Sequence, residues 1–154
     1  MITPARRPQR RVLLSTVSSD SHTWNLVFLQ LLLQESGNEV INLGSCVPDD
    51  VILDAIRVER PDAVVISSVN GHGFLDGRRV IKKLRNTPEG AGLPVMIGGK
   101  LGILGEGNDQ YSDELVAAGF DAVFSDSASP EALTDYLREL PGAQPHELVG
   151  VPGT

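Results

Sequence analysis

The sequence predicts an α/β domain built on a five-stranded parallel sheet with helices on both faces. Short apolar runs alternate with helical segments along 154 residues, which is the length of one domain with a substantial core. The runs are almost continuous in Val, Ile and Leu, which is typical of strands buried on both faces. Such alternation with right-handed crossovers predicts a doubly wound sheet of the flavodoxin-like or Rossmann-like kind.

The strands are expected at the five apolar runs, and the helices at the segments between and after them. In chain order the expected strands are Val12–Val17, Val40–Leu43, Ala63–Ser67, Val95–Ile97 and Ala122–Phe124. The expected helices are Trp24–Gln34, Asp49–Glu59, Gly77–Arg85, Asp109–Ala118 and Pro130–Leu140.

Prolines and glycines mark the helix boundaries. Pro48 and Pro130 stand at helix starts and are followed by acidic residues. A proline suits the start of a helix because the N–H groups of the first turn have no partner within the helix, so the missing N–H of proline costs nothing there. Acidic residues suit the same turn because those N–H groups attract negative charge. Gly37 and Gly119 follow the last turns, where a left-handed residue often ends a helix.

The first helix is apolar on nearly every side. Its apolar residues are Leu26, Val27, Phe28, Leu29, Leu31, Leu32 and Leu33. A helix on a small sheet cannot bury all of its sides, so a partner protein or a ligand is expected to cover part of it.

Composition limits the classes of partner. The net charge of −7 argues against binding to nucleic acid or to an anionic membrane. Four arginines near the start, Arg6, Arg7, Arg10 and Arg11, are expected to be solvated. No apolar run reaches the ~20 residues of a membrane span, so a cytoplasmic protein is expected.

The domain is expected to cover residues 11–140, between a flexible arm at 1–10 and a flexible tail at 141–154.

The single cysteine, Cys46, excludes an internal disulfide and a zinc site made of cysteines only. No base lies near it in the sequence, so it is expected to fill space and to carry no chemistry.

Three strand-to-helix loops carry the residues that suggest chemistry. The loop after the first strand contains Asp20-Ser21-His22, the loop after the third contains Ser67-Ser68-Val69, and the loop after the fourth contains Gly98-Gly99. In flavodoxin-like order these three strands are neighbours, so the loops are expected to line one crevice at the carboxyl edge. Such a crevice offers a metal-ligating imidazole, small hydroxyls and a stretch without side chains, which suits a long ligand with a metal at its head.

Other ligands of this fold fit the sequence less well. Asp20 would repel the phosphate of a flavin nucleotide. A response regulator needs an acidic phosphoacceptor where this chain has Ser67, and no Gly-x-Gly-x-x-Gly follows the first strand.

The three motifs together resemble the cobalamin-binding domain of base-off/His-on enzymes, whose signature is Asp-x-His-x-x-Gly, Ser-x-Leu and Gly-Gly. The similarity runs from about Arg11 to Leu140 and is closest to the small (sigma or S) subunits of glutamate mutase. The stretch from Val64 to Gly73 looks especially similar to the third strand and loop of those subunits.

The resemblance implies roles for the matching residues. His22 would be the lower axial ligand of cobalt, and Asp20 would hydrogen-bond its far nitrogen, so that these two are the candidate catalytic residues. Ser67 would bind the displaced dimethylbenzimidazole, and Gly98 would let the nucleotide tail approach the sheet. The full set of candidate cofactor-binding residues is Ser19, Asp20, Ser21, His22, Thr23, Ser67, Ser68, Val69, Gly98, Gly99, Lys100, Leu101, Gly102 and Ile103. Ser125 and Ser127, after the fifth strand, are further candidates that would line the far side of the crevice. His72 and His146 are expected to bind no metal.

Two residues depart from the signature. Val69 replaces the leucine and keeps the apolar contact. Asn25 replaces the glycine, where its side chain would either obstruct the nucleotide tail or hydrogen-bond it.

The resemblance further implies adenosylcobalamin, with its cobalt, as cofactor and a radical rearrangement of L-glutamate to threo-3-methylaspartate. The substrate would bind mainly in the barrel of a separate large catalytic subunit, so a hetero-oligomer is expected. The alternatives are a non-catalytic B12 carrier or sensor, and a corrinoid protein for methyl transfer. Methyl-transfer proteins usually carry a helical bundle ahead of this domain, and a first strand near Arg11 favours the mutase subunit.

Overall fold

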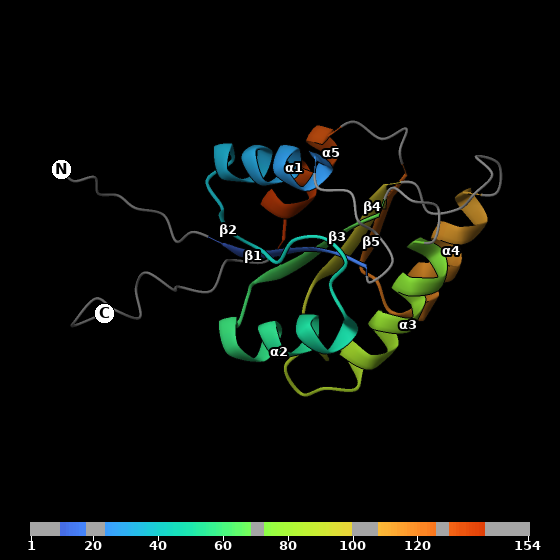
Figure 1. Cartoon of the computed structure of the whole chain (residues 1–154). Coiled ribbons are helices and arrows are strands. Elements are labelled where there is room, and N and C mark those ends of the chain that lie inside the picture. Colours follow the sequence, from blue (N-terminus) through green and yellow to red (C-terminus); the bar gives the residue numbers. More distant parts are fainter. Residues whose placement is uncertain (1–9, 18–23, 69–72, 100–107, 126–129, 141–154) are drawn as a thin grey trace.

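The computed structural model describes residues 10–17, 24–68, 73–99, 108–125 and 130–140, in which strands and helices alternate (Figure 1). The strands are β1 (Arg11–Thr16), β2 (Glu39–Asn42), β3 (Ala63–Ser68), β4 (Val95–Gly99) and β5 (Ala122–Ser125). The helices are α1 (Trp24–Glu35), α2 (Asp49–Glu59), α3 (Gly73–Arg85), α4 (Asn108–Ala118) and α5 (Pro130–Arg138).

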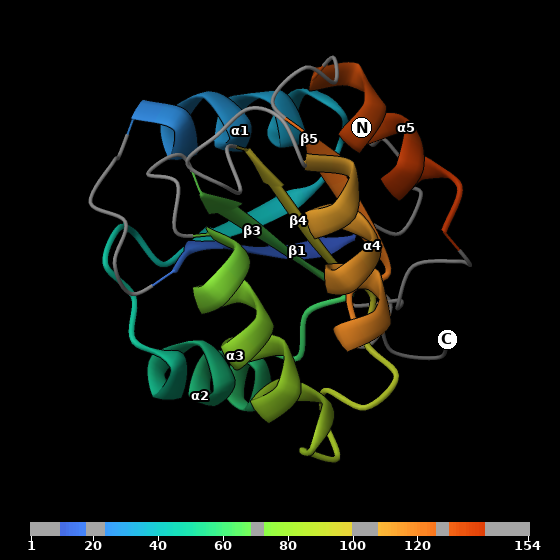
Figure 2. The ribbon, with the colours of Figure 1, turned by 90° about the vertical axis from the view of Figure 1, so that its right-hand side faces the viewer.

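The strands form one parallel sheet in the order β2-β1-β3-β4-β5. Helices α1 and α5 cover one face, and α2, α3 and α4 cover the other, as the two views in Figures 1 and 2 show. This is the expected doubly wound sheet, and strands β1, β3 and β4 are neighbours as predicted.

Alternation along the strands divides the core into two layers. On β1, Leu13 belongs to the layer under α2, α3 and α4, while Val12 and Leu14 belong to the layer under α1 and α5. Each of these three side chains is fully buried. Burial on both faces explains why the strands read as continuous apolar runs.

Three boundaries differ from the sequence prediction in ways that affect the site. Ser68 is the last residue of β3, and Gly98 and Gly99 are the last residues of β4, so these three belong to strands and not to loops. Pairing with β5 extends β4 through the two glycines, since Gly98 pairs with Phe124. Helix α3 begins at Gly73, four residues earlier than expected, because Asp76 in its first turn favours a start before Gly77.

The helix-end predictions are confirmed. Pro48 precedes α2, and Asp49 and Asp50 lie in its first turn. Gly37 and Gly119 follow α1 and α4 with φ of 93° and 137°, in the left-handed region where glycine is favoured.

Two arginines expected in a solvated arm have structural contacts instead. Arg10 donates a hydrogen bond from Nη2 to the carbonyl of Leu140 at 2.7 Å. Arg11 is the first residue of β1, and its Nη1 donates to the carbonyl of Glu59 at 2.8 Å. These bonds tie the start of the sheet to the ends of two helices. Residues 1–9 and 141–154, expected to be an arm and a tail, lie outside the described residues.

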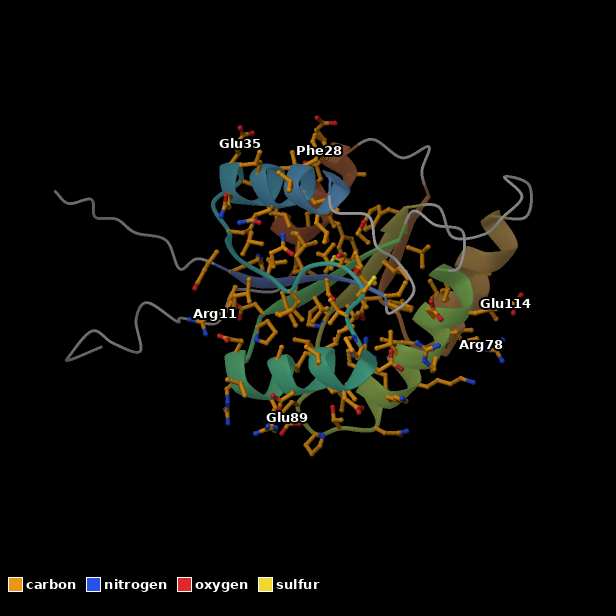
Figure 3. All side chains as sticks on the ribbon, viewed as in Figure 1. Arg11, Phe28, Glu35, Arg78, Glu89 and Glu114 are labelled. Carbon is orange, nitrogen blue, oxygen red and sulfur yellow. The ribbon has the colours of Figure 1, made fainter. Side chains whose placement is uncertain are left out.

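Helix α1 buries one stripe and exposes another. Leu26 and Leu33 are buried against the sheet, whereas Val27, Phe28 and Leu31 are 44%, 50% and 56% exposed. Figure 3 shows Phe28 on the outer side of the helix, pointing away from the sheet. No helix in the described part of the chain is long and apolar enough to cross a membrane.

Cys46 does not fill space in the core as expected. Its side chain is exposed and its φ is 52°, because the short connection from β2 to α2 turns sharply there.

Candidate functional site

The candidate site is a row of side chains across the carboxyl end of the sheet, on the face covered by α1 and α5. Thr16 of β1 pairs with Ser67 of β3, Ser67 pairs with Gly98 of β4, and Gly98 pairs with Phe124 of β5. Residues that pair in parallel register share a face, and Phe124 packs in the layer under α1 and α5. The row therefore places two hydroxyls and a glycine side by side on the three central strands.

This row differs in size and polarity from the row beneath it. The row beneath it consists of the residues two positions earlier on each strand, which are Leu14, Val65, Met96 and Ala122. All four belong to the apolar layer under α1 and α5. Shorter side chains at Ser67 and Gly98 contribute little volume above the central strands. The hydroxyls also provide hydrogen-bonding groups at a depth where the rest of the layer is apolar.

Ser67 and Gly98 are held tightly. Ser67 is 3% exposed and already has a polar interaction within the protein. A Cβ added at Gly98 would lie 3.2 Å from the carbonyl oxygen of Phe124 and 3.3 Å from its Cβ. The neighbouring strand β5 would have to move slightly to accept a side chain at Gly98, so close packing favours a glycine there.

The structure brings together only part of the predicted site. Ser67, Ser68, Gly98 and Gly99 end neighbouring strands and pair in register. The other candidate residues lie outside the described residues: Ser19, Asp20, Ser21, His22, Thr23, Val69, Lys100, Leu101, Gly102 and Ile103. The same holds for His72, Ser127 and His146, while Ser125 ends β5. Asn25 is the second residue of α1.

Thr16 is a residue of the row that sequence reasoning missed. It is 1% exposed, and its Oγ1 donates a hydrogen bond to the carbonyl of Gly44 at 3.1 Å. A threonine at the end of an apolar strand is an ordinary residue, so no local signal marks it. Its pairing with Ser67 is visible only in the register of the sheet.

An aromatic pair closes the row at β5. The rings of Phe124 and Tyr136 of α5 meet edge to face, with centroids 5.9 Å apart. The Tyr136 hydroxyl lies 3.5 Å from the carbonyl of Asp121. Burial, and secondly the negative charge of Asp121, raise the pKa of Tyr136, so its hydroxyl is neutral at physiological pH.

A charged cluster joins α2 to α3 on the opposite face of the sheet. The buried carboxylate of Asp49 receives Arg79 Nε at 2.7 Å and Arg79 Nη2 at 3.1 Å, and Lys83 Nζ lies 3.2 Å away. Burial by itself would raise the pKa of Asp49, but the bonds from Arg79 and Lys83 outweigh it and hold that pKa below its usual value. Arg79 also binds Asp76 at 2.9 Å, and its pKa is raised, chiefly by the hydrogen bond to Asp49. All of these charges are paired, so the cluster fits a structural role.

Within the described residues, no three His, Cys, Asp or Glu side chains come together in a way that could hold a metal ion. A single axial ligand at His22 would lie outside that part of the chain.

Comparisons with known proteins agree with the sequence resemblance. A family model described as the B12 binding domain matches residues 10–124. Glutamate mutase sigma subunit 1 of Haloarcula marismortui is 32% identical over 132 residues, which cover 84% of this chain and 85% of that protein.

Similar folds occur among solved structures. A cobalamin-binding protein from Desulfitobacterium hafniense has a TM-score of 0.70 and 25% identity, over 87% of this chain and 60% of that chain. This chain therefore spans less than two thirds of that protein's length. The response regulator CheY4 of Vibrio cholerae has a TM-score of 0.61 at 18% identity, over 84% of this chain and 97% of that chain, which shows a shared fold alone.

Proposed function

The chain belongs to the B12-binding domain family, and from that membership we propose that it is the cobalamin-binding small subunit of a carbon-skeleton mutase of the glutamate mutase type. The observation that carries the proposal is the row at the carboxyl edge, where Ser67 and Gly98 pair on neighbouring strands. These are the residues that match the second and third motifs of the family. Their small size and the buried hydroxyl suit the nucleotide tail of a cobalamin lying against this face of the sheet.

Each matching residue has a proposed task in holding the cofactor. His22 would hold the cobalt through one imidazole nitrogen, and Asp20 would accept a hydrogen bond from the N–H of the same ring, which would fix the tautomer and raise the basicity of the imidazole. Ser67 offers its hydroxyl to the displaced base, and Gly98 and Gly99 allow the tail to approach β4. When bound, adenosylcobalamin supplies a cobalt–carbon bond that can be cleaved homolytically.

The remaining proposed binding residues end or follow the strands β1, β3 and β4 in the sequence. They are Ser19, Ser21, Thr23, Ser68, Val69, Lys100, Leu101, Gly102 and Ile103. Residues 11–140 form the proposed binding domain, which works in the cytoplasm.

Catalysis is proposed to need a second protein. In the glutamate mutase reaction L-glutamate is interconverted with threo-3-methylaspartate, and a large barrel subunit holds the substrate. The relatives named as sigma subunits support an isomerase complex in which this chain contributes the cofactor and its axial ligand.

Absorbance titration with adenosylcobalamin tests the proposal. The wild type is expected to give the base-off/His-on spectrum, and His22→Gly is expected to lose it. His146→Gly removes another histidine from the tail and should keep the wild-type spectrum. An unchanged spectrum in His22→Gly would show that cobalt is not bound by that residue and would overturn the ligand assignment.

A further inference from the structure

Among the residues of α1 whose side chains the structure describes, Gln30 is the polar residue on the stripe that faces the sheet. Gln30 lies four residues after Leu26 and three before Leu33, and both leucines are buried. Its Oε1 accepts a hydrogen bond from Asn42 Nδ2 at 3.0 Å. Because Asn42 is the last residue of β2, this bond ties the middle of α1 to the carboxyl end of the sheet.

The hydrogen bonds continue from Asn42 to β1. Asn42 Oδ1 accepts the backbone N–H of Gly44 at 2.8 Å, and the carbonyl of Gly44 accepts Thr16 Oγ1 at 3.1 Å. Gly44 has a φ of 97°, a left-handed conformation that a residue with a Cβ rarely adopts. We refer to Gln30, Asn42, Gly44 and Thr16 as the α1 clamp.

The two ends of the α1 clamp flank the segment that carries the proposed axial ligand. Thr16 ends β1 and Gln30 lies in α1, and the chain between them contains Asp20 and His22. Thr16 also pairs with Ser67 in the row of the candidate site. The clamp therefore fixes α1 against the carboxyl end of β1, on the face that carries this row.

We propose that the α1 clamp is a positioning device for cobalamin binding: its hydrogen bonds fix α1 against the carboxyl end of β1, and cobalt ligation by His22 depends on that fixed geometry. This inference rests on the proposed function. A segment whose ends are already fixed loses less conformational freedom when its histidine binds the metal. Thr16, Asn42 and Gln30 act through His22 and are positioning residues.

The test removes the Thr16 hydroxyl without changing the shape of the side chain. Thr16→Val loses the bond to Gly44, and Thr16→Ser retains a hydroxyl. Thr87→Val is the matched control, because Thr87 Oγ1 bonds the carbonyl of Leu84 and the N–H of Gly90 at the opposite edge of the sheet. Each protein is titrated with adenosylcobalamin and with cobinamide, a corrinoid that has no nucleotide tail. Amide hydrogen exchange of residues 24–35 is measured without cofactor.

Loss of one hydrogen bond should weaken adenosylcobalamin binding about three- to tenfold in Thr16→Val and lower the His-on fraction with both corrinoids. Faster exchange in α1 should accompany it. Thr16→Ser should restore ligation, and Thr87→Val should leave it unchanged.

Wild-type affinity and His-on fraction in Thr16→Val would overturn the α1 clamp while the proposed function stands. Equal losses in Thr87→Val would overturn it too, since a general loss of stability would then explain both. A wild-type protein that binds no cobalamin would overturn the proposed function itself, together with the clamp's role in it.

Discussion

At the scale of single residues, Asp49 and Asp50 show how neighbouring acids differ. Both lie in the first turn of α2, where a negative charge interacts favourably with the helix N-terminus. Only Asp49 is buried, and it binds Arg79 through two hydrogen bonds and pairs with Lys83. The helix-start pattern predicted both acids equally, because it contains no information about α3.

We expect Asp49→Asn to destabilise the protein by about 1–2 kcal/mol at pH 7, a modest cost since Arg79 is 43% exposed. Asp50→Asn should cost less, about 0.3–1 kcal/mol, because it loses only the helix-terminus interaction. Urea unfolding of the two variants measures the difference.

The same pair predicts a pH dependence. Because the folded-state pKa of Asp49 is lowered, its stabilising contribution is complete above the unfolded pKa near 4 and is lost as the pH falls through the folded pKa. The gap in unfolding free energy between wild type and Asp49→Asn should therefore be constant from pH 5 to pH 7. A gap that instead shrinks between pH 7 and pH 5 would contradict the assignment.

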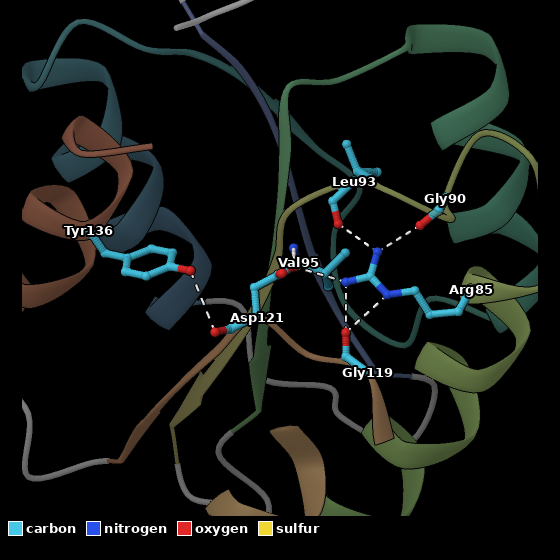
Figure 4. Close-up of polar contacts among 7 residues, drawn as sticks. All are labelled: Arg85, Gly90, Leu93, Val95, Gly119, Asp121 and Tyr136. Atoms are coloured by element: carbon cyan, nitrogen blue, oxygen red, sulfur yellow. Dashed lines mark hydrogen bonds and ion pairs between the residues drawn. The ribbon is translucent and has the colours of Figure 1, made fainter. Parts of the chain in front are cut away.

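At the scale of elements, Arg85 in the last turn of α3 joins three segments at the amino edge of the sheet (Figure 4). Its guanidinium donates to the carbonyls of Gly90, Leu93 and Gly119 and pairs with Asp121 at 2.8 Å. Asp121 Oδ2 also accepts the N–H of Val95, so one arginine holds the starts of β4 and β5 together. The pairing of Gly98 with Phe124 at the other end of these strands depends on that register.

We expect Arg85→Met to lower the free energy of unfolding by about 2–3 kcal/mol, because three partly buried carbonyls lose their donor. Arg138→Met is the matched control. Arg138 is 66% exposed and pairs only locally with Asp135, so its loss should cost less than about 0.5 kcal/mol. Thermal and urea unfolding measure the loss of stability in each variant. Equal losses in Arg85→Met and Arg138→Met would show that Arg85 does not hold the starts of β4 and β5 together.

At the scale of the whole molecule, α1 presents the apolar side chains Val27, Phe28 and Leu31 to solvent. The sequence predicted that a helix apolar on nearly every side would need further cover. The structure shows that the sheet covers one stripe only. The exposed apolar stripe of Val27, Phe28 and Leu31 is consistent with the proposal that the protein works in a complex.

Reconstitution tests that proposal. The chain by itself should show no glutamate–methylaspartate interconversion, and activity should appear when a glutamate mutase large subunit and adenosylcobalamin are added. The expected rate with His22→Gly is at least tenfold lower, since the axial ligand is lost. Cobalamin binding without turnover in any such mixture would favour a non-catalytic carrier or sensor.

Much of the fold could be predicted because it depends on local patterns. Continuous Val and Ile runs identified all five strands, and Pro48, Gly37 and Gly119 identified helix ends. The errors fell where the chain loses that pattern: a strand ending in two glycines has no β-propensity to mark it, yet pairing with β5 extends β4 to Gly99.

The sequence by itself determined the class of sheet and the family, because periodicity and motif spacing are written along the chain, whereas the structure decided between the flavodoxin-like and Rossmann-like strand orders. The tertiary structure alone decided which side chains meet: Thr16 beside Ser67, Asp49 against Arg79, and Gln30 linked through Asn42 to β1. These contacts join residues far apart in sequence. They depend on strand register and on the angle of each helix over the sheet, and packing of the whole core sets both.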